Sequence, residues 1–504
     1  MSLHQSGKNE RYNLVVIGAG AAGLTVAAGA AGLGARVALV ERGAMGGDCL
    51  NYGCVPSKAL LAAAAAAHQT RRFLAAAGVP APSALHRDAQ WSRATAQVRA
   101  AIAAIAPHDS EARFRSLGVE VFAGHGRWVG GKAGGPHVEV ISEGGASRIL
   151  HTRSVVLATG SRPLIPPIPG LTEAGFLTNE TLFDLPQLPA RIAVLGGGPV
   201  GVELAQALVR LGAQVHLVEK MPWLLPREDP DATAVLADAL SAEGLILHLG
   251  KTVVRVAGDG AERRLELEPA AGLAPGESRE VLKVDQVLVA VGRQPNSEGL
   301  GLECAADRGD SAAGGFIPVD TRMRTRHRGV FACGDVAGPH LFTHTANHQA
   351  RVVIQNALFP FKTAYGEPLP PWCLFTDPEL ARVGLNEREA RAHGRPYRTV
   401  TIPMAAMDRA VCEGNTTGFL KVLTPPRGDD ILGATLVGAH AGELIHLIAL
   451  ALHSGLKLRD LSQMMHVYPT RSEVMRRAGD ENRKLGFTPL LRAWVERYLR
   501  WRRG

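Results

Sequence analysis

Two cysteines stand five positions apart in the stretch GGDCLNYGCVPSKALL, which runs from Gly46 to Leu61. The chain has only 6 cysteines in 504 residues, and they lack the dense, even spacing of a secreted disulfide scaffold. This usage indicates a reducing compartment, so we expect a cytoplasmic protein. A close pair in such a compartment is typical of redox chemistry or metal binding.

A glycine-rich fingerprint precedes the cysteine pair. The segment from Tyr12 to Glu41 has the pattern of a strand, a tight turn, an alanine-rich helix and a second strand, and Gly18, Gly20 and Gly23 supply G-x-G-x-x-G. One glycine turns the chain, one lets the backbone approach a pyrophosphate, and one lets the helix pack on the strand. Glu41 ends the second strand, where a carboxylate can accept hydrogen bonds from ribose hydroxyls. The segment predicts a dinucleotide-binding unit.

The same pattern recurs from Arg191 to Glu219, with Gly196, Gly198 and Gly201. In both copies 23 positions separate the first glycine from the terminal glutamate. Two such units indicate two nucleotide cofactors, and the natural pair is a flavin and a nicotinamide dinucleotide. Because the cysteine pair follows the first fingerprint, and such a pair exchanges electrons readily with a flavin, we assign FAD to the first unit and NAD(P)H to the second.

From Tyr12 to about Gly486 the chain resembles the class I pyridine nucleotide-disulfide oxidoreductases, the family of glutathione reductase, dihydrolipoamide dehydrogenase and mercuric reductase. The motifs that carry the resemblance are GAGAAG, GGDCLNYGCVPSK, ATGSRP, GGGPVGVE, VGRQPN, ACGDV, FTDPELARVG and HVYPTRSE. The resemblance implies an α/β fold with two Rossmann-like dinucleotide-binding domains, for FAD and NAD(P), and a C-terminal α+β dimerisation domain. It also implies a homodimeric flavoenzyme.

The expected organisation has five parts. They are an FAD-binding part over residues 1–168, an NAD(P)-binding domain over 169–293, a second FAD-binding or central part over 294–366, a dimerisation domain over 367–486 and a basic tail over 487–504. Within the dimerisation domain we expect strands at 397–403, 418–423 and 431–437 and a helix at 441–454. By resemblance, its HVYPT segment completes the active site of the partner subunit.

The resemblance gives the cysteine pair its roles. Cys49 and Cys54 form a redox-active disulfide, in which Cys49 attacks the substrate and Cys54 donates charge to the flavin. Glycines 46, 47 and 53 permit the distorted helical start that lets the sulfurs meet. A thiolate at a helix start near Lys58 has a lowered pKa. The alternative, a zinc site, needs two more ligands at comparable spacing, and the sequence supplies none, so we expect no metal ligands.

The resemblance also implies a set of further site residues. Lys58 pairs with Glu203 beside the flavin ring, whereas the alternative for Glu203 is a solvated helix residue. Asp335 binds the ribityl or phosphate part of FAD, or else caps a helix. The full FAD set is Gly18, Gly20, Gly23, Glu41, Arg42, Gly47, Asp48, Lys58, Thr159, Gly160, Gly334 and Asp335. The NAD(P) set is Gly196, Gly198, Gly201, Glu203, Glu219 and Gly292. The catalytic set is Cys49, Cys54, Lys58, Glu203, Tyr468 and Glu473. The remaining cysteines, 304, 333, 373 and 412, are expected in the core.

The nicotinamide preference depends on Glu219. A carboxylate at this strand end accepts from the 2'-hydroxyl of NADH and repels a 2'-phosphate. Lys220 and Arg227 lie close by in the sequence and could instead bind that phosphate. We expect NADH, with NADPH as the alternative.

Three departures from the family pattern bear on the substrate. Asp48 replaces the usual threonine beside Cys49, and its charge would raise the thiol pKa unless it points to solvent or to FAD. No cysteine pair that could hand over a metal ion follows Cys412, unlike in mercuric reductases. Tyr468 replaces the histidine that precedes Pro-Thr in thiol-exchanging relatives, so Glu473 could only accept a hydrogen bond from the phenol.

These departures leave three functional hypotheses. The first is a mercuric reductase-like enzyme that passes electrons to a metal ion or another small acceptor, which Tyr468 favours. The second is a dihydrolipoamide dehydrogenase-like disulfide reductase, which the stretch GAHAGELI favours. The third is a flavin redox sensor with little turnover.

The net charge of +8 is concentrated at the C-terminus, where residues 475–504 carry nine Lys/Arg and three acidic residues. Aromatic residues make up only 5% of the chain, so nucleic acid is not an expected partner. From Pro489 onward apolar residues fall near one helical face, which predicts an amphipathic basic helix. That helix either packs on its own dimer or makes a weak membrane-surface contact.

Overall fold

The computed structural model describes residues 11–79, 84–130, 136–258, 262–270, 279–302, 315–366 and 369–504. Its first sheet has the strand order β3-β2-β1-β6-β5-β4, with β16 also paired to β6. The strands are β1 (Tyr12–Ile17), β2 (Val37–Glu41), β3 (Glu120–Ala123), β4 (His125–Trp128), β5 (His137–Ile141), β6 (Ser147–Leu157) and β16 (Val330–Ala332). The neighbours β3, β2, β1, β6 and β16 run parallel, whereas β4, β5 and β6 pair antiparallel.

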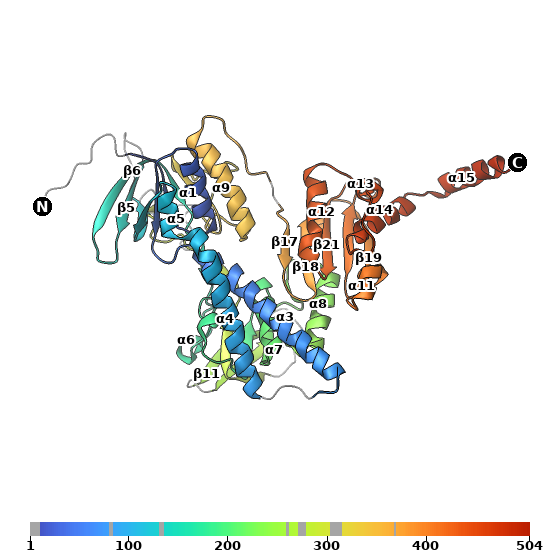
Figure 1. Cartoon of the computed structure of the whole chain (residues 1–504), viewed down its shortest axis with the longest axis horizontal. Helices are drawn as coiled ribbons and strands as arrows, with labels where there is room; N and C mark the ends of the chain where they lie inside the picture. Colours follow the sequence, from blue (N-terminus) through green and yellow to red (C-terminus); the bar gives the residue numbers. More distant parts are fainter. Residues whose placement is uncertain are drawn as a thin grey trace.

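The parallel part of this sheet is buried on both faces. Alternate residues of β1 enter different cores: Leu14 and Val16 pack with α1 and α9, and Val15 and Ile17 pack on the opposite face. Such a strand has a continuous apolar sequence, which explains LVVI in β1. The flanking helices are α1 (Ala21–Gly32), α2 (Gly47–Asn51), α3 (Cys54–Ala76), α4 (Ala84–Asp109), α5 (Glu111–Ser116) and α9 (Thr343–Leu358), of which α3 and α4 extend along the second unit in Figure 1.

The second unit repeats the dinucleotide-binding pattern in a parallel sheet of order β10-β9-β8-β14. Its elements are β8 (Arg191–Leu195), α7 (Pro199–Arg210), β9 (Gln214–Glu219), α8 (Pro230–Ala242), β10 (Ile246–Leu249) and β14 (Gln286–Val289). An antiparallel sheet joins β11 (Lys251–Gly258), β12 (Arg263–Pro269) and β13 (Glu280–Val284). Near the chain crossings, β7 (Ser161–Pro163) pairs with β15 (Arg293–Pro295), and α6 (Leu171–Ala174) and a 3-10 turn (Leu182–Asp184) lie between β7 and β8.

The C-terminal unit is a five-stranded antiparallel sheet of order β17-β18-β21-β20-β19. Its strands are β17 (Trp372–Leu374), β18 (Glu379–Gly384), β19 (Arg398–Pro403), β20 (Phe419–Thr424) and β21 (Gly433–Gly438). Its helices are α10 (Glu387–Ala392), a 3-10 turn (Met404–Ala406), α11 (Asp408–Cys412), α12 (Ala441–His453), α13 (Leu458–Gln463) and α14 (Glu473–Leu485). The three expected strands and the helix at 441–454 are confirmed to within two residues. Glu367, the expected start of this unit, lies outside the described residues.

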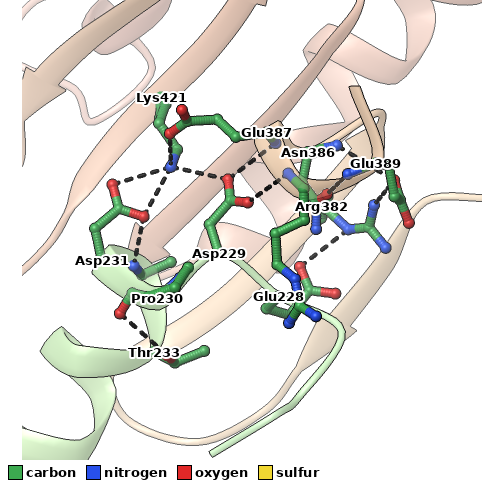
Figure 2. A network of polar contacts seen from close by, with 12 residues as sticks. Glu228, Asp229, Pro230, Asp231, Thr233, Arg382, Asn386, Glu387, Glu389 and Lys421 are labelled. Carbon is green, nitrogen blue, oxygen red and sulfur yellow. Dashed lines mark hydrogen bonds and ion pairs between the residues drawn. The ribbon is translucent and has the colours of Figure 1, made fainter. Parts of the chain in front are cut away.

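The C-terminal half has one helix that extends away from the fold and one charge network that connects it to the second dinucleotide unit. The last helix, α15 (Pro489–Arg502), extends away from the rest of the chain in Figure 1. The second is a buried charge network that joins the C-terminal sheet to the second dinucleotide unit (Figure 2). No helix in the described part of the chain is both long and apolar enough to cross a bilayer.

The centre of that network is Lys421 on β20, whose ammonium group lies 2.8 Å from Asp229, 2.7 Å from Asp231 and 2.8 Å from Glu387 (Figure 2). Burial by itself lowers the pKa of Lys421, but the hydrogen bonds to the three carboxylates outweigh it and raise the pKa. Among the described residues, these carboxylates are the only group spaced to hold a metal ion, and the ammonium group lies among them. The lysine supplies the cation that this cluster needs.

Candidate active site

The first and third glycines have the same geometry in both fingerprints. Gly18 and Gly196 have φ angles of 105° and 107°, which L side chains rarely adopt. A Cβ on Gly23 would lie 1.8 Å from the carbonyl oxygen of Gly18, and a Cβ on Gly201 would lie 2.0 Å from that of Gly196. These four positions therefore require glycine, for the turn and for the close approach of the helix.

The second glycines have a different reason to lack a side chain. A Cβ on Gly198 would meet nothing within 4 Å, and one on Gly20 would meet only the Cα of Gly47 at 3.9 Å. Each glycine immediately precedes a helix N-terminus, where backbone N–H groups attract phosphate oxygens. The open space in front of Gly20 and Gly198 fits a pyrophosphate group in both units.

The two strand-end glutamates also make matching contacts. Glu41 accepts hydrogen bonds from the backbone N–H of Ala19 at 2.5 Å and of Gly43 at 2.7 Å. Glu219 accepts them from Gly197 at 2.6 Å and Met221 at 2.8 Å. Each carboxylate thus joins its own strand end to the residue after the first glycine, and it is fixed at the position expected for the ribose partner.

A cavity of about 820 Å³ lies between the first fingerprint and the cysteine pair, near the upper end of the range usual for ligand sites. Of the residues expected to bind FAD, all except Gly23 line it. Cys49, Cys54, Lys58 and Glu203 line it as well. A smaller cavity of about 70 Å³ adjoins its far end at Glu41, Arg42 and Thr159. The shape, the glycine turn and the fixed glutamate all fit an FAD molecule with its reactive end at the cysteines.

The expected nicotinamide residues do not line this cavity, except Glu203. Gly196, Gly198, Gly201 and Glu219 lie together at the carboxyl end of the second parallel sheet. Gly292 follows β14 in the same unit, with a φ of 147°. Pro199, Val200 and Glu203, all on α7, connect this second site to the large cavity.

The cysteines lie on two successive helices. Cys49 is in α2 and Cys54 is the first residue of α3. Gly46 and Gly47 adopt φ angles of 88° and 59°, and a Cβ on Gly53 would lie 2.7 Å from a carboxylate oxygen of Asp48. The interrupted helical start expected from the three glycines is therefore confirmed. Both cysteines are free thiols here, the reduced state of the proposed pair.

The environment divides charge unequally between the two thiols. The Cys49 thiol is hydrogen-bonded to Cys54, and this contact lowers the pKa of Cys54 to about 6, with help from the Thr343 hydroxyl and the charge of Lys58. The same contact and burial raise the pKa of Cys49. The Oγ1 of Thr343 donates to Cys49 at 3.3 Å and lies 3.5 Å from the sulfur of Cys54. The reduced pair thus holds one proton on Cys49 and one negative charge on Cys54.

Asp48 lines the cavity and also contacts two neighbouring polar side chains. Its carboxylate lies 3.1 Å from the guanidinium of Arg293, and the Asn179 amide donates to it at 3.4 Å. Asp48 raises the pKa of both thiols, but less than the other groups that act on them. The Arg293 guanidinium places an opposite charge beside the aspartate, and the penalty expected from Asp48 is present but small.

Arg293 also connects Asp48 to Asp335. Its Nε donates to Ser161 at 2.7 Å, and Ser161 donates to Asp335 at 2.6 Å. Burial raises the pKa of Asp335. Asp335 lines the cavity and caps no helix, since the N-cap of the following helix α9 is Phe342.

The expected contact between Lys58 and Glu203 is present at 2.7 Å. The second carboxylate oxygen of Glu203 accepts from the backbone N–H of Phe375 at 2.9 Å, and the Lys58 ammonium lies 4.7 Å from the centre of the Phe375 ring. The Glu203 side chain is only 7% exposed. The alternative of a solvated helix residue is wrong.

We expect Lys58→Met to raise the pKa of the Cys54 thiol, because Lys58 is one of the groups that lower it and because Glu203 would be left as an unpaired buried carboxylate. The pH dependence of Cys54 alkylation by iodoacetamide in the reduced protein measures this pKa. Lys58→Arg keeps the charge and serves as the matched control. An unchanged alkylation midpoint in Lys58→Met would remove Lys58 from thiolate stabilisation.

The HVYPT segment departs from expectation. The Tyr468 hydroxyl donates to Asp408 at 2.9 Å and not to Glu473, whose Oε1 pairs with Arg476 at 3.1 Å. The hydrogen bond and charge of Asp408 raise the pKa of Tyr468. His466 contacts the carbonyl of Leu461 at 2.9 Å. Neither Tyr468 nor Glu473 lines the cavity of its own chain.

The scattered cysteines were not all core residues. Cys333 is buried as expected, but Cys412 is exposed on the short helix α11 and Cys373 is only partly buried. Cys373 lines the cavity, and burial raises its pKa. Cys304 lies outside the described residues. The errors at 373 and 412 arose because isolated cysteines carry no periodic signal of burial.

Sequence reasoning did not identify Thr343, Arg293 or Phe375 as site residues. Arg293 is part of the motif VGRQPN and Phe375 begins FTDPELARVG. Each motif marked its residue as a family feature, but the sequence did not show which residues Arg293 and Phe375 contact. Thr343 reaches the cysteines from 294 positions away. Only the packing of α9 against the first unit brings it there.

Comparison with known proteins agrees with this geometry. The pyridine nucleotide-disulphide oxidoreductase family matches residues 12–354, and the dimerisation domain of that family matches residues 370–478. The chain belongs to this family, whose members are enzymes that use FAD and NAD(P)H. The dimerisation domain indicates a homodimer.

Individual relatives define the class more closely. A dihydrolipoyl dehydrogenase of Thermus scotoductus is 36% identical, over 93% of this chain and 97% of its own. A mercuric reductase of Staphylococcus aureus is 30% identical, over 93% of this chain and 82% of its own.

Solved structures give the same result. A Cu(II) complex of the HOCl-induced flavoprotein disulfide reductase RclA from Escherichia coli aligns with a TM-score of 0.80 at 28% identity, over 93% of this chain and 99% of that one. LpdA from Mycobacterium tuberculosis aligns with a TM-score of 0.81 at 28% identity, with the same coverage. The protein is a flavoprotein disulfide reductase of the class that includes dihydrolipoyl dehydrogenase and mercuric reductase.

Proposed function

We propose that the protein is a mercuric reductase-like enzyme that uses NADH to reduce a metal ion or another small acceptor at the Cys49/Cys54 pair. When bound, FAD supplies two-electron exchange between the nicotinamide and the cysteine pair. Its proposed binding residues are the cavity-lining members of the FAD set, with Gly20 and Glu41 at the pyrophosphate and ribose. The observation that supports this acceptor class best is Tyr468, whose phenol is hydrogen-bonded to Asp408.

Reduction of a disulfide substrate needs an acid that protonates the leaving thiolate, and the reverse oxidation of a dithiol needs the same group as a base. Tyrosine has an unperturbed pKa near 10, and Asp408 raises that of Tyr468, so at neutral pH the phenol is not that base and is a weaker acid than the leaving thiol. A soft metal ion needs no such base, because thiolates bind it directly. Cys54 is already a thiolate above about pH 6, and Cys49 releases its proton when the ion binds.

The names of two relatives support a metal ion as the acceptor. One curated relative is a mercuric reductase, and one structural relative is a Cu(II) complex. The second candidate, a dihydrolipoyl dehydrogenase-like activity, is favoured by the 36% identity to such an enzyme. The proposed catalytic roles are nucleophile for Cys49, charge donor for Cys54, and an ion pair beside the flavin site for Lys58 and Glu203.

Steady-state NADH oxidation with Hg(II), Cu(II), lipoamide and glutathione disulfide in parallel tests the acceptor. We expect turnover with at least one metal ion and slow turnover with both disulfides. Rapid lipoamide reduction by the wild-type enzyme would favour the dihydrolipoyl dehydrogenase-like reading instead. Slow turnover with every acceptor would favour a redox sensor.

We expect a higher kcat/KM with NADH than with NADPH, because Glu219 is fixed by the backbone of Gly197 and Met221 where a 2'-phosphate would lie. Each tenfold preference corresponds to about 1.4 kcal/mol, which one carboxylate opposed to a phosphate can supply. Glu219→Gln should reduce the ratio. Equal use of both nucleotides by the wild type would mean that the exposed Lys220 or Arg227 overrides the glutamate.

A further inference from the structure

The last helix, α15, is specified by its own sequence. It begins after residues 486–488, the short link that follows α14, and the Thr488 hydroxyl caps it by accepting from the N–H of Leu491 at 3.2 Å. Pro489 occupies its first turn, where proline is favoured. These signals fix where the helix begins and favour helix formation in this segment.

No residue of α15 is buried in the described chain. Leu490 is 84% exposed, Trp494 is 63% exposed and Trp501 is 75% exposed. The rings of Trp494 and Tyr498 stack at 5.8 Å, and those of Tyr498 and Trp501 lie 6.0 Å apart. Spacings of three and four residues place these rings along one face of the helix. An apolar face of this kind on a soluble enzyme marks an interaction surface.

The opposite face is basic. From Pro489 to Gly504 there are five arginines and one glutamate, a net charge of +4. Arg492, Arg500 and Arg503 lie on the side away from the rings, whereas Arg497 and Arg502 flank the ring face on either side. This combination of an aromatic apolar face and an arginine-rich polar face is typical of helices that lie in a membrane interface.

Charge also decides between a lipid surface and a second copy of this chain. The whole chain carries +8 and residues 475–504 carry +6, so the remaining residues of a second copy carry only +2 and offer no acidic excess to attract the tail. Two α15 helices would repel each other. An anionic bilayer supplies both the apolar layer for the rings and negative headgroups for the arginines.

We propose that α15 lies flat in the headgroup region of anionic membranes and holds the flavoenzyme at the membrane surface without spanning the bilayer. In the homodimer two such helices act together, which strengthens binding beyond that of one. The redox chemistry at the cysteine pair is independent of this contact, so the proposal does not rest on the identity of the acceptor.

The test is flotation of the FAD-loaded full-length dimer with vesicles of phosphatidylcholine, with or without phosphatidylglycerol. We expect flotation only with the anionic vesicles, and its loss when the chain is ended after Leu485. Arg500→Gln with Arg503→Gln should weaken partitioning about fivefold for each arginine removed. Arg93→Gln with Arg99→Gln removes two exposed arginines from α4 and is the matched control, with unchanged flotation expected.

A second measurement uses brominated phosphatidylglycerol, which quenches tryptophans that enter the headgroup region. We expect quenching in the full-length dimer and none in Trp494→Phe with Trp501→Phe, while NADH oxidation is unchanged. Equal flotation of full-length and truncated dimers would overturn the proposal. So would absence of flotation together with dissociation of the dimer on truncation, since α15 would then cover a second copy.

Discussion

In the two-electron-reduced enzyme, Cys54→Ser is expected to abolish the long-wavelength charge-transfer absorption, whereas Cys49→Ser is expected to show it even without reductant. The reason is the division of charge between the thiols: hydrogen bonding from Cys49 lowers the pKa of Cys54 and raises that of Cys49. Cys54 is therefore the thiolate that can donate to the flavin. Absorption spectra of the two purified variants, before and after anaerobic NADH addition, measure the effect.

The same assignment predicts a pH dependence. A thiol with a pKa near 6 is charged above that value, so the absorption of the reduced wild type should be present at neutral pH and should disappear as the pH falls through about 6. In Cys49→Ser the serine hydroxyl still donates to Cys54, and the band should persist. A band retained in Cys54→Ser and lost in Cys49→Ser would reverse the two roles. Turnover with every acceptor should fall to background in both variants, since neither can re-form the disulfide.

Tyr468→His is expected to raise lipoamide and glutathione disulfide reduction, by as much as the roughly 10²- to 10⁴-fold that general base catalysis contributes. In disulfide reduction the enzyme thiolate attacks the substrate disulfide and a thiolate leaves; an imidazolium, with an unperturbed pKa near 6.5, can protonate that leaving thiolate, whereas the phenol holds its proton more tightly than a thiol does. Steady-state kcat/KM for both disulfides, with NADH as donor, measures the gain.

The surroundings of Tyr468 are suited to this replacement. Glu473 is buried, and its Oε2 has no hydrogen-bond partner within the described chain. Its charge already raises the pKa of Tyr468, so the two groups are close enough to interact. An imidazole that donates one N–H to this oxygen would be oriented and charge-stabilised, as a general base requires. His466 cannot replace it, because it is held at the carbonyl of Leu461.

Tyr468→Phe is the matched control, since it removes the hydroxyl without adding a base. Its disulfide turnover should equal that of the wild type, and its metal-ion turnover should be unchanged if the phenol takes no part in the chemistry. No gain in disulfide turnover in Tyr468→His, with the fold and dimer intact, would place the cause of slow turnover elsewhere in the pocket.

Local sequence predicted the parts of the site that depend on backbone geometry. The glycines at 18, 23, 196 and 201 are fixed by φ or by contacts within their own turn, so the pattern alone determines them. The interrupted helix around Cys49 and Cys54 follows from glycines 46 and 47 in the same way. The three strands expected in the C-terminal sheet lie within two residues of β19, β20 and β21.

Contacts across the fold could not be predicted in this way. The effect of Asp48 on the thiol pKa values depends on Arg293, which lies on a strand of another unit. The sequence around either residue does not indicate that the two are in contact. The hydrogen bond of Tyr468 goes to Asp408 rather than to Glu473, because α11, which carries Asp408, packs beside the segment. The bridging of both sulfurs by Thr343 likewise exists only after α9 has docked.

Lys421 and its three carboxylates determine how the C-terminal unit is oriented against the second dinucleotide unit. A buried ion network of this kind determines the orientation of the parts it joins more than it stabilises them, because desolvation offsets much of the attraction. Asp229 and Asp231 belong to the second dinucleotide unit, whereas Lys421 on β20 and Glu387 on α10 belong to the dimerisation domain. Rotation of the second dinucleotide unit against the C-terminal unit would break these ion pairs, so the network resists a hinge between the two units.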